Sequence, residues 1–297
     1  MLYYRQKVLL SLLKALGGKV LSTDFQKYIF MFTMLCEKDK SYDFVPYRYG
    51  CYSFQASMDK NKLIEKGYLK NVPGWELIKL NLNYVKELKK GDDKKVSMFV
   101  DRYGSKQGKS LIQHVYRNYP YYAINSVIAK EHLSSVELEK IKLARPTKRR
   151  NSSFATIGYE GGSVESYLNK LIENDVRMLV DVRKNPISRK YGFSKRTLSS
   201  LLGKVGIEYS HIPELGIESA ERKELKTQQD YNRLFDKYEK TILKTQTKAL
   251  EGLFNLYKEK KRIAITCFEK EHCQCHRSRV ANAIESISKG EVITQHL

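Results

Sequence analysis

The second half of the chain alternates short apolar runs with helical patterns, and this alternation constrains the fold more than any other feature. Between the runs, apolar residues recur at three- and four-residue spacing, which is typical of helices that bury one face. The predicted strands are 154–159, 177–183, 206–212, 262–267 and 292–294. Strands that alternate with helices form mainly parallel sheets with right-handed connections. The sequence therefore predicts an α/β domain over residues 153–297.

Cysteine and histidine are concentrated just after the predicted strand 262–267. Cys267 ends this strand, and Cys273, Cys275 and two histidines precede the helix that starts near Arg277. Ligand sites in open parallel sheets lie beyond the carboxyl ends of the strands, and helix N-termini favour anions. We therefore expect a functional site here. The alternative is a buried Cys267 followed by a solvated turn.

Several polar residues share this expected position at strand ends or in the loops that follow. Cys275 precedes a helix N-terminus beside His276 and Arg277, a setting that lowers the pKa of a thiol, so we expect it to be more reactive than Cys267. Arginines near the Gly161–Gly162 turn favour an anionic small molecule or nucleotide. The predicted catalytic residues are Cys275, Glu269, Asp181 and Glu214, and the predicted ligand-binding residues are Gly158, Tyr159, Arg183, Cys267, His276 and Arg277. Asp181 and Arg183 have an alternative role as an internal ion pair that braces the sheet.

Zinc is a competing explanation of the cysteines. Cys267, Cys273 and Cys275, with either His272 or His276, supply enough ligands for zinc. The spacing C-x5-C-x-C-H lacks the two-residue gaps that are typical of zinc fingers and ribbons. We therefore predict no metal ligands, and the sequence identifies no cofactor.

Four short segments of the second half also resemble a known family. They are Thr156–Tyr159, Val180–Ser188, Pro213–Gly216 and the pair Cys267–Glu269 with Cys275–Arg277. In this order they resemble the family called domain of unknown function 488, over about residues 153–297. The resemblance implies a small Rossmann-like domain with a polar pocket built from strand ends, and no settled activity. The residues that match the family pattern are Asp181, Arg183, Cys267, Glu269, Cys275, His276 and Arg277, whereas Cys273 stands at a variable position.

The net charge of +21 is concentrated in the first half. Residues 1–150 contain 29 Lys and Arg against 14 Asp and Glu, whereas the remaining residues contain 25 against 19. A strongly basic domain most often has a polyanionic partner, and nucleic acid is a more common one than a membrane. A lysine-rich surface without a partner is the alternative.

The first half predicts helices over about 8–16, 24–35 and 54–66, followed by a hairpin over 68–80 with a turn at Pro73–Gly74. Three helices and a hairpin are the order of a winged helix, so we expect a mostly α, winged-helix-like domain over residues 1–143. We expect its partner to be nucleic acid, and DNA before RNA. A basic linker is predicted over 144–152. The predicted nucleic-acid contacts are Tyr47, Arg48, Tyr49, Lys60, Lys62, Lys66, Lys148, Arg149 and Arg150.

The aromatic segment 44–54 lies between the second and third of these predicted helices. It resembles a segment of the antitoxin-like, phage-associated domain of the SocA type, and this second resemblance covers about residues 5–125. It implies a protein partner for the first half.

Other features of the sequence indicate the cellular compartment of the protein. The sequence has no apolar run long enough to cross a bilayer, and its opening lacks the pattern of a signal peptide. Five cysteines, odd in number, do not form a disulfide framework. We therefore expect a cytoplasmic protein without a membrane partner, while its oligomeric state stays open.

These patterns favour a nucleic-acid-associated enzyme. In this hypothesis the first half holds DNA or RNA, and the strand-end pocket of the second half acts on a base, a nucleotide or a phosphate-bearing group. Two alternatives stay open, because binding sites and catalytic sites share arginines and carboxylates. One is a DNA-binding regulator that senses a nucleotide-like metabolite without turnover, and the other is an antitoxin-like protein that binds a partner.

Overall fold

The structure is a computed structural model that describes residues 1–148, 151–222 and 225–297. The chain divides into two compact units, Met1–Arg145 and Pro146–Leu297, and the division lies inside the predicted linker 144–152. Within the described residues, every helix is too short or too polar to span a bilayer. Each unit has its own core and is described separately below.

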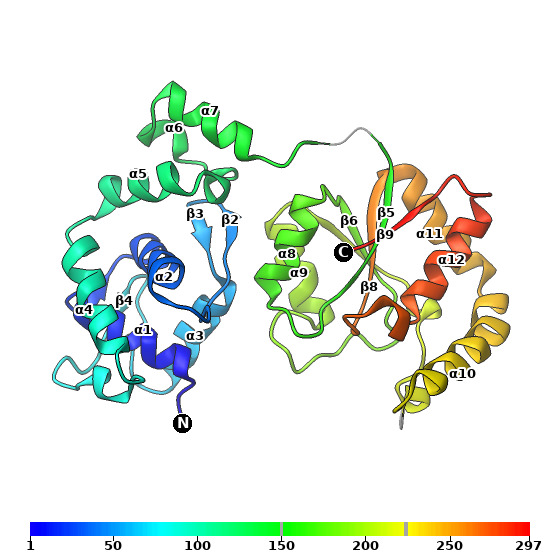
Figure 1. The fold of residues 1–297 in the computed structure, drawn as a ribbon, viewed down its shortest axis with the longest axis horizontal. Helices are drawn as coiled ribbons and strands as arrows, with labels where there is room; N and C mark the ends of the chain where they lie inside the picture. Colours follow the sequence, from blue (N-terminus) through cyan, green and yellow to red (C-terminus); the bar gives the residue numbers. More distant parts are fainter. Residues whose placement is uncertain (149–150, 223–224) are drawn as a thin grey trace. The chain divides into compact units, whose positions relative to one another are not determined.

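The second unit is built on a five-stranded sheet in which all neighbouring strands are parallel (Figure 1). Its order is β7-β6-β8-β5-β9. The strands are β5 (Ser153–Gly158), β6 (Met178–Asp181), β7 (Glu208–His211), β8 (Arg262–Cys267) and β9 (Thr294–His296). The prediction of a mainly parallel α/β sheet is thus confirmed. The predicted last strand at 292–294 is displaced, because Val292 packs into the core ahead of β9.

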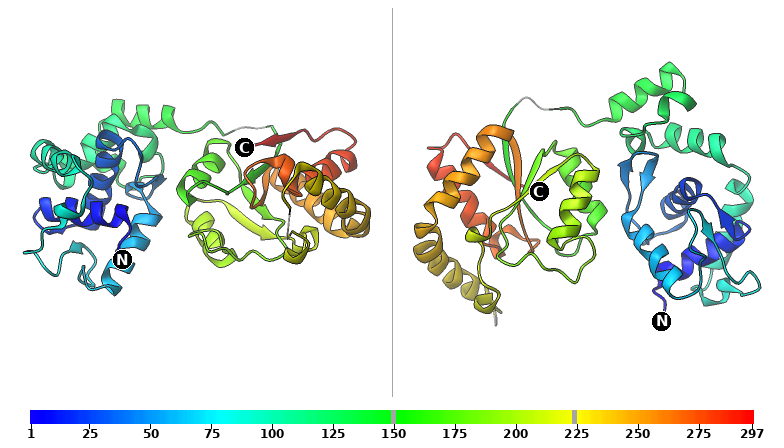
Figure 2. Two further views of the ribbon diagram at one scale, coloured as in Figure 1. Left: turned by 60° about the horizontal axis from the view of Figure 1, so that its bottom comes forward. Right: turned by 180° about the vertical axis from the view of Figure 1, so that it is seen from behind.

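Helices cover both faces of this sheet, as the views in Figures 1 and 2 show. They are α8 (Val164–Glu173), α9 (Lys195–Lys204), α10 (Gln228–Tyr238), α11 (Thr247–Lys260) and α12 (Arg277–Ile287). The chain moves from β5 through β6 to β7 in one direction and returns through β8 to β9 in the other. Because the connections of parallel strands are right-handed, reversing the direction moves the connecting helices to the opposite face. Accordingly, α8 and α9 cover one face, and α10 to α12 cover the other.

Along each strand, successive side chains point to opposite faces of the sheet. Phe154, Val180 and Ile265 belong to one buried cluster with side chains from α10, α11 and α12. Their neighbours Ala155 and Leu179 are equally buried but lie outside that cluster, on the face that α8 and α9 cover. Strands that are buried on both faces have continuous apolar sequences, which explains why these strands could be predicted from the sequence.

The predicted helical region 231–260 contains two α-helices rather than one. Helix α10 ends at Tyr238, a π-helical turn covers Glu239–Leu243 (η5), and α11 begins at Thr247. Thr227 begins α10 by accepting a hydrogen bond from the backbone N–H of Asp230, which satisfies one otherwise unpaired donor. The long connection therefore has enough length to cross from β7, at the sheet edge, to the central strand β8.

The first unit is mostly helical. Its helices are α1 (Tyr4–Ala15), α2 (Ser22–Cys36), α3 (Phe54–Glu65), α4 (Asp92–Tyr103), α5 (Gly108–Asn118), α6 (Ala129–His132) and α7 (Ser135–Ala144), with 3-10 turns η1 (Tyr84–Glu87) and η2 (Pro120–Ala123). Helix α3 starts at Ser53, whose side chain accepts a hydrogen bond from the backbone N–H of Ala56. The three helices predicted for this unit are therefore present, and further helices follow them.

The aromatic segment between the second and third helices is a hairpin. Strand β2 (Val45–Tyr47) pairs with β3 (Gly50–Tyr52), and Tyr47 lies opposite Gly50. Gly50 adopts φ +99°, and a Cβ at this position would lie 2.6 Å from the ring of Tyr116. Glycine is the residue that adopts this backbone conformation without cost, so it allows the tight turn.

The predicted hairpin over 68–80 is much reduced. Strand β4 (Trp75–Glu76) pairs with β1 (Lys19–Val20), and within 68–80 a bridge joins Leu69 to Leu77. These pairings connect the segment after α3 to the turn between α1 and α2. The winged-helix interpretation stays a prediction, since strands of two residues are too short to define a wing.

Candidate functional site at the end of the central strand

The functional candidates of the second unit meet at the carboxyl end of β8. Strand β8 lies between β5 and β6. After β5 and β6 the chain continues to the face covered by α8 and α9, whereas after β8 it continues to α12 on the opposite face. Neighbouring strands that lead to opposite faces open a crevice at their carboxyl ends, where open α/β sheets bind ligands. A cavity of about 430 Å³ lies here. Its lining residues are Tyr159, Arg183, Lys184, Asn185, Ile187, Ser188, Arg189, Ile217, Arg222, Cys267, Phe268 and Glu269.

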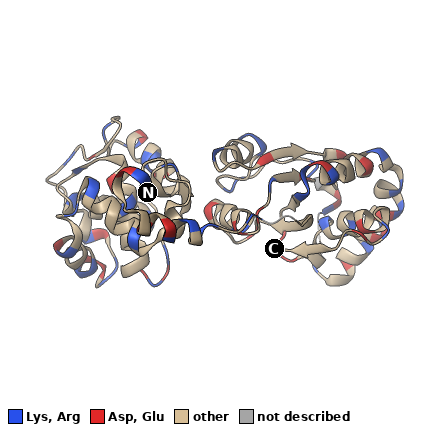
Figure 3. Ribbon diagram, turned by 90° about the horizontal axis from the view of Figure 1, so that it is seen from above, with Lys and Arg blue, Asp and Glu red and all other residues tan. Residues whose placement is uncertain are grey.

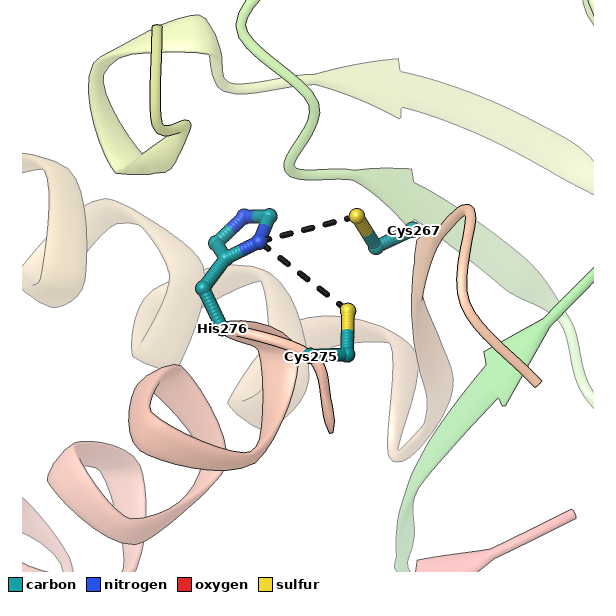
Figure 4. Close-up of side chains that lie close together, drawn as sticks. All are labelled: Cys267, Cys275 and His276. Carbon is teal, nitrogen blue, oxygen red and sulfur yellow. Dashed lines mark hydrogen bonds between the residues drawn. The ribbon is translucent and has the colours of Figure 1, made fainter. Parts of the chain in front are cut away.

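Two cysteines and one histidine form a compact buried cluster at the base of this cavity. Cys267 ends β8, while Cys275 and His276 immediately precede α12 (Figure 4). His276 Nδ1 lies 3.5 Å from the Sγ of Cys267 and 4.0 Å from the Sγ of Cys275. None of the three residues is more than 1% exposed. The sequence placed these residues together correctly, although Cys267 alone lines the cavity.

Hydrogen bonds define the orientation of the His276 ring. Its Nε2 lies 3.0 Å from the carbonyl oxygen of Val182, which can only accept, so Nε2 carries the proton. Nδ1 is therefore an acceptor, and the Nη2 of Arg222 donates to it at 2.6 Å. The lone pair of Nδ1 thus faces the two sulfurs and the guanidinium.

Arg222 was not predicted as a site residue. It lies in η4 (Ser219–Arg222), in a loop without a recognisable motif, and it reaches residues that are about 50 positions away in sequence. Its Nη1 lies 2.7 Å from Glu269 Oε1, and its Nη2 lies 3.7 Å from the sulfur of Cys267. Glu269 Oε2 in turn lies 3.4 Å from the same sulfur. A guanidinium and a carboxyl group therefore flank the Cys267 thiol.

The pKa directions of the two thiols favour the opposite order of reactivity from the one expected from the sequence. Burial alone raises the pKa of Cys267, but hydrogen bonds with Cys275 and His276 and the positive charge of Arg222 outweigh it and hold this pKa well below its usual value. Burial, followed by the contact with Cys267, raises the pKa of Cys275 well above its usual value. These directions favour Cys267 as the more reactive thiol, whereas the expectation that Cys275 is the more reactive one stays a prediction.

The pKa of Glu269 lies above that of an exposed carboxyl group. Burial, followed by the negative charge of Cys267, raises the pKa of Glu269, although Arg222 lowers it in part. A carboxyl group with this environment is suited to proton transfer. Of the four predicted catalytic residues, Glu269 has the position and environment that the prediction requires.

Asp181 lies beneath the cavity rather than in it. Its carboxylate is fully buried and accepts hydrogen bonds from Arg183 Nε at 2.8 Å and Nη2 at 2.5 Å, and from the Tyr209 hydroxyl at 2.8 Å. The Nη1 of Arg183 donates to the hydroxyl of Tyr159 at 2.8 Å and to the carbonyl of Phe193 at 2.9 Å. The alternative of an internal ion pair is therefore the better description, and Asp181 orients the Arg183 guanidinium that lines the cavity.

Arg277 and Gly158, which are predicted to bind a ligand, shape the loop after β8. Arg277 donates to the carbonyl of Glu269, to the carbonyl of Lys270 at 2.8 Å and to the Thr156 hydroxyl at 3.4 Å, and it is 1% exposed. A Cβ on Gly158 would lie 1.9 Å from the Glu269 carbonyl oxygen. These residues bring the loop against β5, and thereby place the Glu269 side chain beside Cys267.

The remaining predicted residues divide between the site and the surface. Tyr159 lines the cavity and stacks on Phe193 with a ring separation of 4.2 Å. Glu214 is exposed in η3 (Pro213–Leu215) and is not among the residues that line the cavity. Cys273 is exposed, and His272 stacks on His296 at 3.8 Å, so neither belongs to the buried cluster.

The predicted nucleic-acid contacts lie in various environments in the first unit. Arg48 and Tyr49 are exposed at the tip of the β2–β3 hairpin, and Tyr47 packs against Tyr52. Lys60 donates to the carbonyls of Val72 and Pro73, Lys62 pairs with Glu65, and Lys66 donates to the carbonyl of Met1. In the linker, Lys148 is exposed, whereas Arg149 and Arg150 lie outside the described residues.

The fold defines the second unit as a parallel α/β domain with a cavity at the carboxyl ends of its strands. A family model described as Domain of unknown function DUF488 matches residues 163–284. The second unit therefore contains a domain of this family, as its resemblance implied. No curated protein and no solved structure matches the chain.

Proposed function

We propose that the α/β domain is an enzyme that acts on a nucleotide or another phosphate-bearing ligand, and that the first unit holds nucleic acid. The observation that carries the proposal is the charge of the cavity. Arg183, Lys184, Arg189 and Arg222 line it, and Glu269 is the one acidic residue among the lining residues. Guanidinium groups bind phosphate with charge-assisted, often bidentate hydrogen bonds.

The arrangement divides the cavity into a binding region and a reactive region. Arg189 and Lys184 lie on the loop after β6, where an anionic group enters, and Arg183 is held rigidly below by Asp181. Glu269 and Cys267 lie at the base, so a ligand bound through its phosphate presents its remaining atoms to them. Glu269 would transfer the proton that a substitution or hydrolysis at the ligand requires. A volume of about 430 Å³ is within the range of small-molecule sites.

The experiment measures binding and turnover of a panel of nucleoside mono-, di- and triphosphates and short oligonucleotides. Calorimetry detects binding, and mass spectrometry of the incubated ligands detects products. We expect Arg189→Ala to weaken binding by about 1–3 kcal/mol, the range for losing a hydrogen bond to a charged group. Lys248→Ala removes one positive charge from the exposed surface of α11, so it is the matched control and should bind as the wild type does.

The outcomes separate the two functions that share this cavity. Chemical change of a bound ligand supports the enzyme. A ligand that is retained unchanged by the wild-type protein supports the regulator that senses a metabolite. Equal affinities of the wild-type protein, Arg189→Ala and Lys248→Ala would contradict a phosphate site in this cavity.

A further inference from the structure

We propose that Cys267, Cys275 and His276 bind one Zn²⁺ ion at the base of the cavity. The ligand atoms of these three residues all lie within 4.8 Å of one another. The site stands on this geometry alone, and only the chemical role of the metal rests on the proposed function. The sequence spacing argued against zinc because it lacks two-residue gaps, but the fold brings the ligand atoms of these three residues together.

The two nitrogen–sulfur separations are close to those of a tetrahedral zinc site. With Zn–S near ~2.3 Å and Zn–N near ~2.0 Å, zinc holds a sulfur and a nitrogen ligand about 3.5 Å apart. His276 Nδ1 lies 3.5 Å from Cys267 Sγ and 4.0 Å from Cys275 Sγ (Figure 4). Small rotations of the side chains therefore suffice to bring all three atoms to one ion. Two sulfurs and one imidazole nitrogen favour zinc over magnesium or calcium, which prefer oxygen ligands.

The hydrogen bond that orients a metal-binding histidine is already present at His276. A histidine ligand is usually held by a hydrogen bond from its other ring nitrogen, which orients the lone pair toward the metal. Here His276 Nε2 donates to the carbonyl of Val182 at 3.0 Å, and the ring packs edge-on against Tyr238 at 5.6 Å. The Arg222 guanidinium donates to Nδ1, so zinc would replace this contact, while Arg222 keeps its pair with Glu269.

The fourth position of the metal faces the reactive region of the cavity. Structural zinc sites have four protein ligands, whereas catalytic sites have three and keep one position open. Glu269 Oε2 lies 3.4 Å from Cys267 Sγ, beside this position, and Cys267 and Glu269 both line the cavity. Zinc at this place would bind a water molecule or a ligand atom next to a carboxyl group that exchanges protons.

The experiment removes metal from the full-length protein with a chelator and titrates Zn²⁺ back against a chromogenic competitor. Elemental mass spectrometry gives the stoichiometry. We expect one zinc ion per chain. Cys267→Ser, Cys275→Ser and His276→Gln should each weaken zinc binding by more than about 100-fold, because a lost ligand should cost at least as much as a lost second-shell partner.

Two controls come from the same loop. Cys273→Ser and His272→Gln change the same residue types within four positions of the ligands, but outside the buried cluster. They should bind zinc as the wild type does. Absence of zinc binding, or a loss of affinity in these controls equal to that of the ligand variants, would overturn the site.

A measurement on the wild-type protein covers the case in which a ligand variant fails to fold. Iodoacetamide should label Cys273 with or without zinc, and should label Cys267 and Cys275 only after the chelator has removed the metal. Co²⁺ in place of zinc should show the visible absorption of a tetrahedral ion and a thiolate charge-transfer band. Labelling of Cys267 and Cys275 that zinc does not change would overturn the proposal. None of these readouts requires a nucleotide, so failure of the zinc site and failure of the nucleotide site are distinguishable.

Discussion

At the scale of the residue, the second unit depends on charged groups that are buried and paired. Asp181 is fully buried, and the side chain of Arg183 is 7% exposed, so each group is compensated by the other rather than by water. Removing one partner of a buried pair leaves an unpaired charge, which is far more costly than the net contribution of the intact pair. The Tyr209 hydroxyl adds a single further hydrogen bond to the carboxylate.

The prediction at this scale compares Asp181→Ala with Tyr209→Phe. Asp181→Ala should lower the free energy of unfolding of the second unit by about 3–5 kcal/mol, and Tyr209→Phe by about 1 kcal/mol. Urea unfolding followed by circular dichroism measures both changes. Trp75, the only tryptophan, lies in the first unit, so its fluorescence is an internal control that neither change should move. Equal effects of the two substitutions would show that the ion pair does not stabilise the domain.

At the scale of the element, single glycines decide which segments approach each other. Gly50 lies at the turn of the β2–β3 hairpin against Tyr116 of α5, and Gly158 lies where the loop after β8 approaches β5. In both places a side chain would meet another part of the protein at less than 3.0 Å. Interiors are close-packed, so such contacts are relieved only by displacing one of the elements.

The prediction at this scale compares Gly50→Ala with Gly91→Ala in the first unit. Both glycines have positive φ, +99° and +90°, but a Cβ on Gly91 would meet nothing within 4 Å. Gly91→Ala should therefore cost only the backbone strain, about 1–2 kcal/mol. Gly50→Ala should cost about 1–3 kcal/mol more, from overpacking against Tyr116. Trp75 fluorescence during urea unfolding measures both, and equal losses would mean that the hairpin does not pack on α5.

At the scale of the whole molecule, the two units differ in charge. Residues 1–150 carry most of the net charge of +21, and Figure 3 shows Lys and Arg spread over many helices of the first unit. A spread of charge favours contact with a polyanion through many phosphate groups rather than one specific anion site. The exposed Arg48 and Tyr49 at the hairpin tip add a cation beside an aromatic ring, a combination that suits nucleic acid.

The prediction at this scale is that the full-length protein binds DNA with a steep dependence on salt. Gel shifts over a salt series should give a linear fall of log affinity with log salt concentration, because phosphate contacts release counterions. Arg48→Ala should weaken binding to all sequences and reduce the slope by about 0.9, the change for one phosphate contact. Lys248→Ala removes a charge from the other unit and should leave the slope unchanged. Absence of binding at low salt would contradict the role proposed for the first unit.

Most strands and helices of the second unit can be predicted from its sequence. So can the grouping of its polar residues at the end of β8. Apolar runs buried on both faces define the strands 154–159 and 262–267, and the alternation with helices implies parallel pairing and a crevice at the strand ends. These conclusions depend on the short-range spacing of apolar residues, which a single sequence shows directly. The same reasoning located Cys267, Glu269, Cys275 and His276 in one place.

The surroundings of each site residue depend on tertiary packing. Arg222 reaches Cys267 and His276 from a distant loop, which no local pattern indicates. The same packing buries Asp181 under Arg183, and it separates the exposed Cys273 from the buried Cys275 only two residues away. Local spacing places residues on an element, but the direction of a side chain and the charges around it depend on segments that the fold brings together from far apart in sequence.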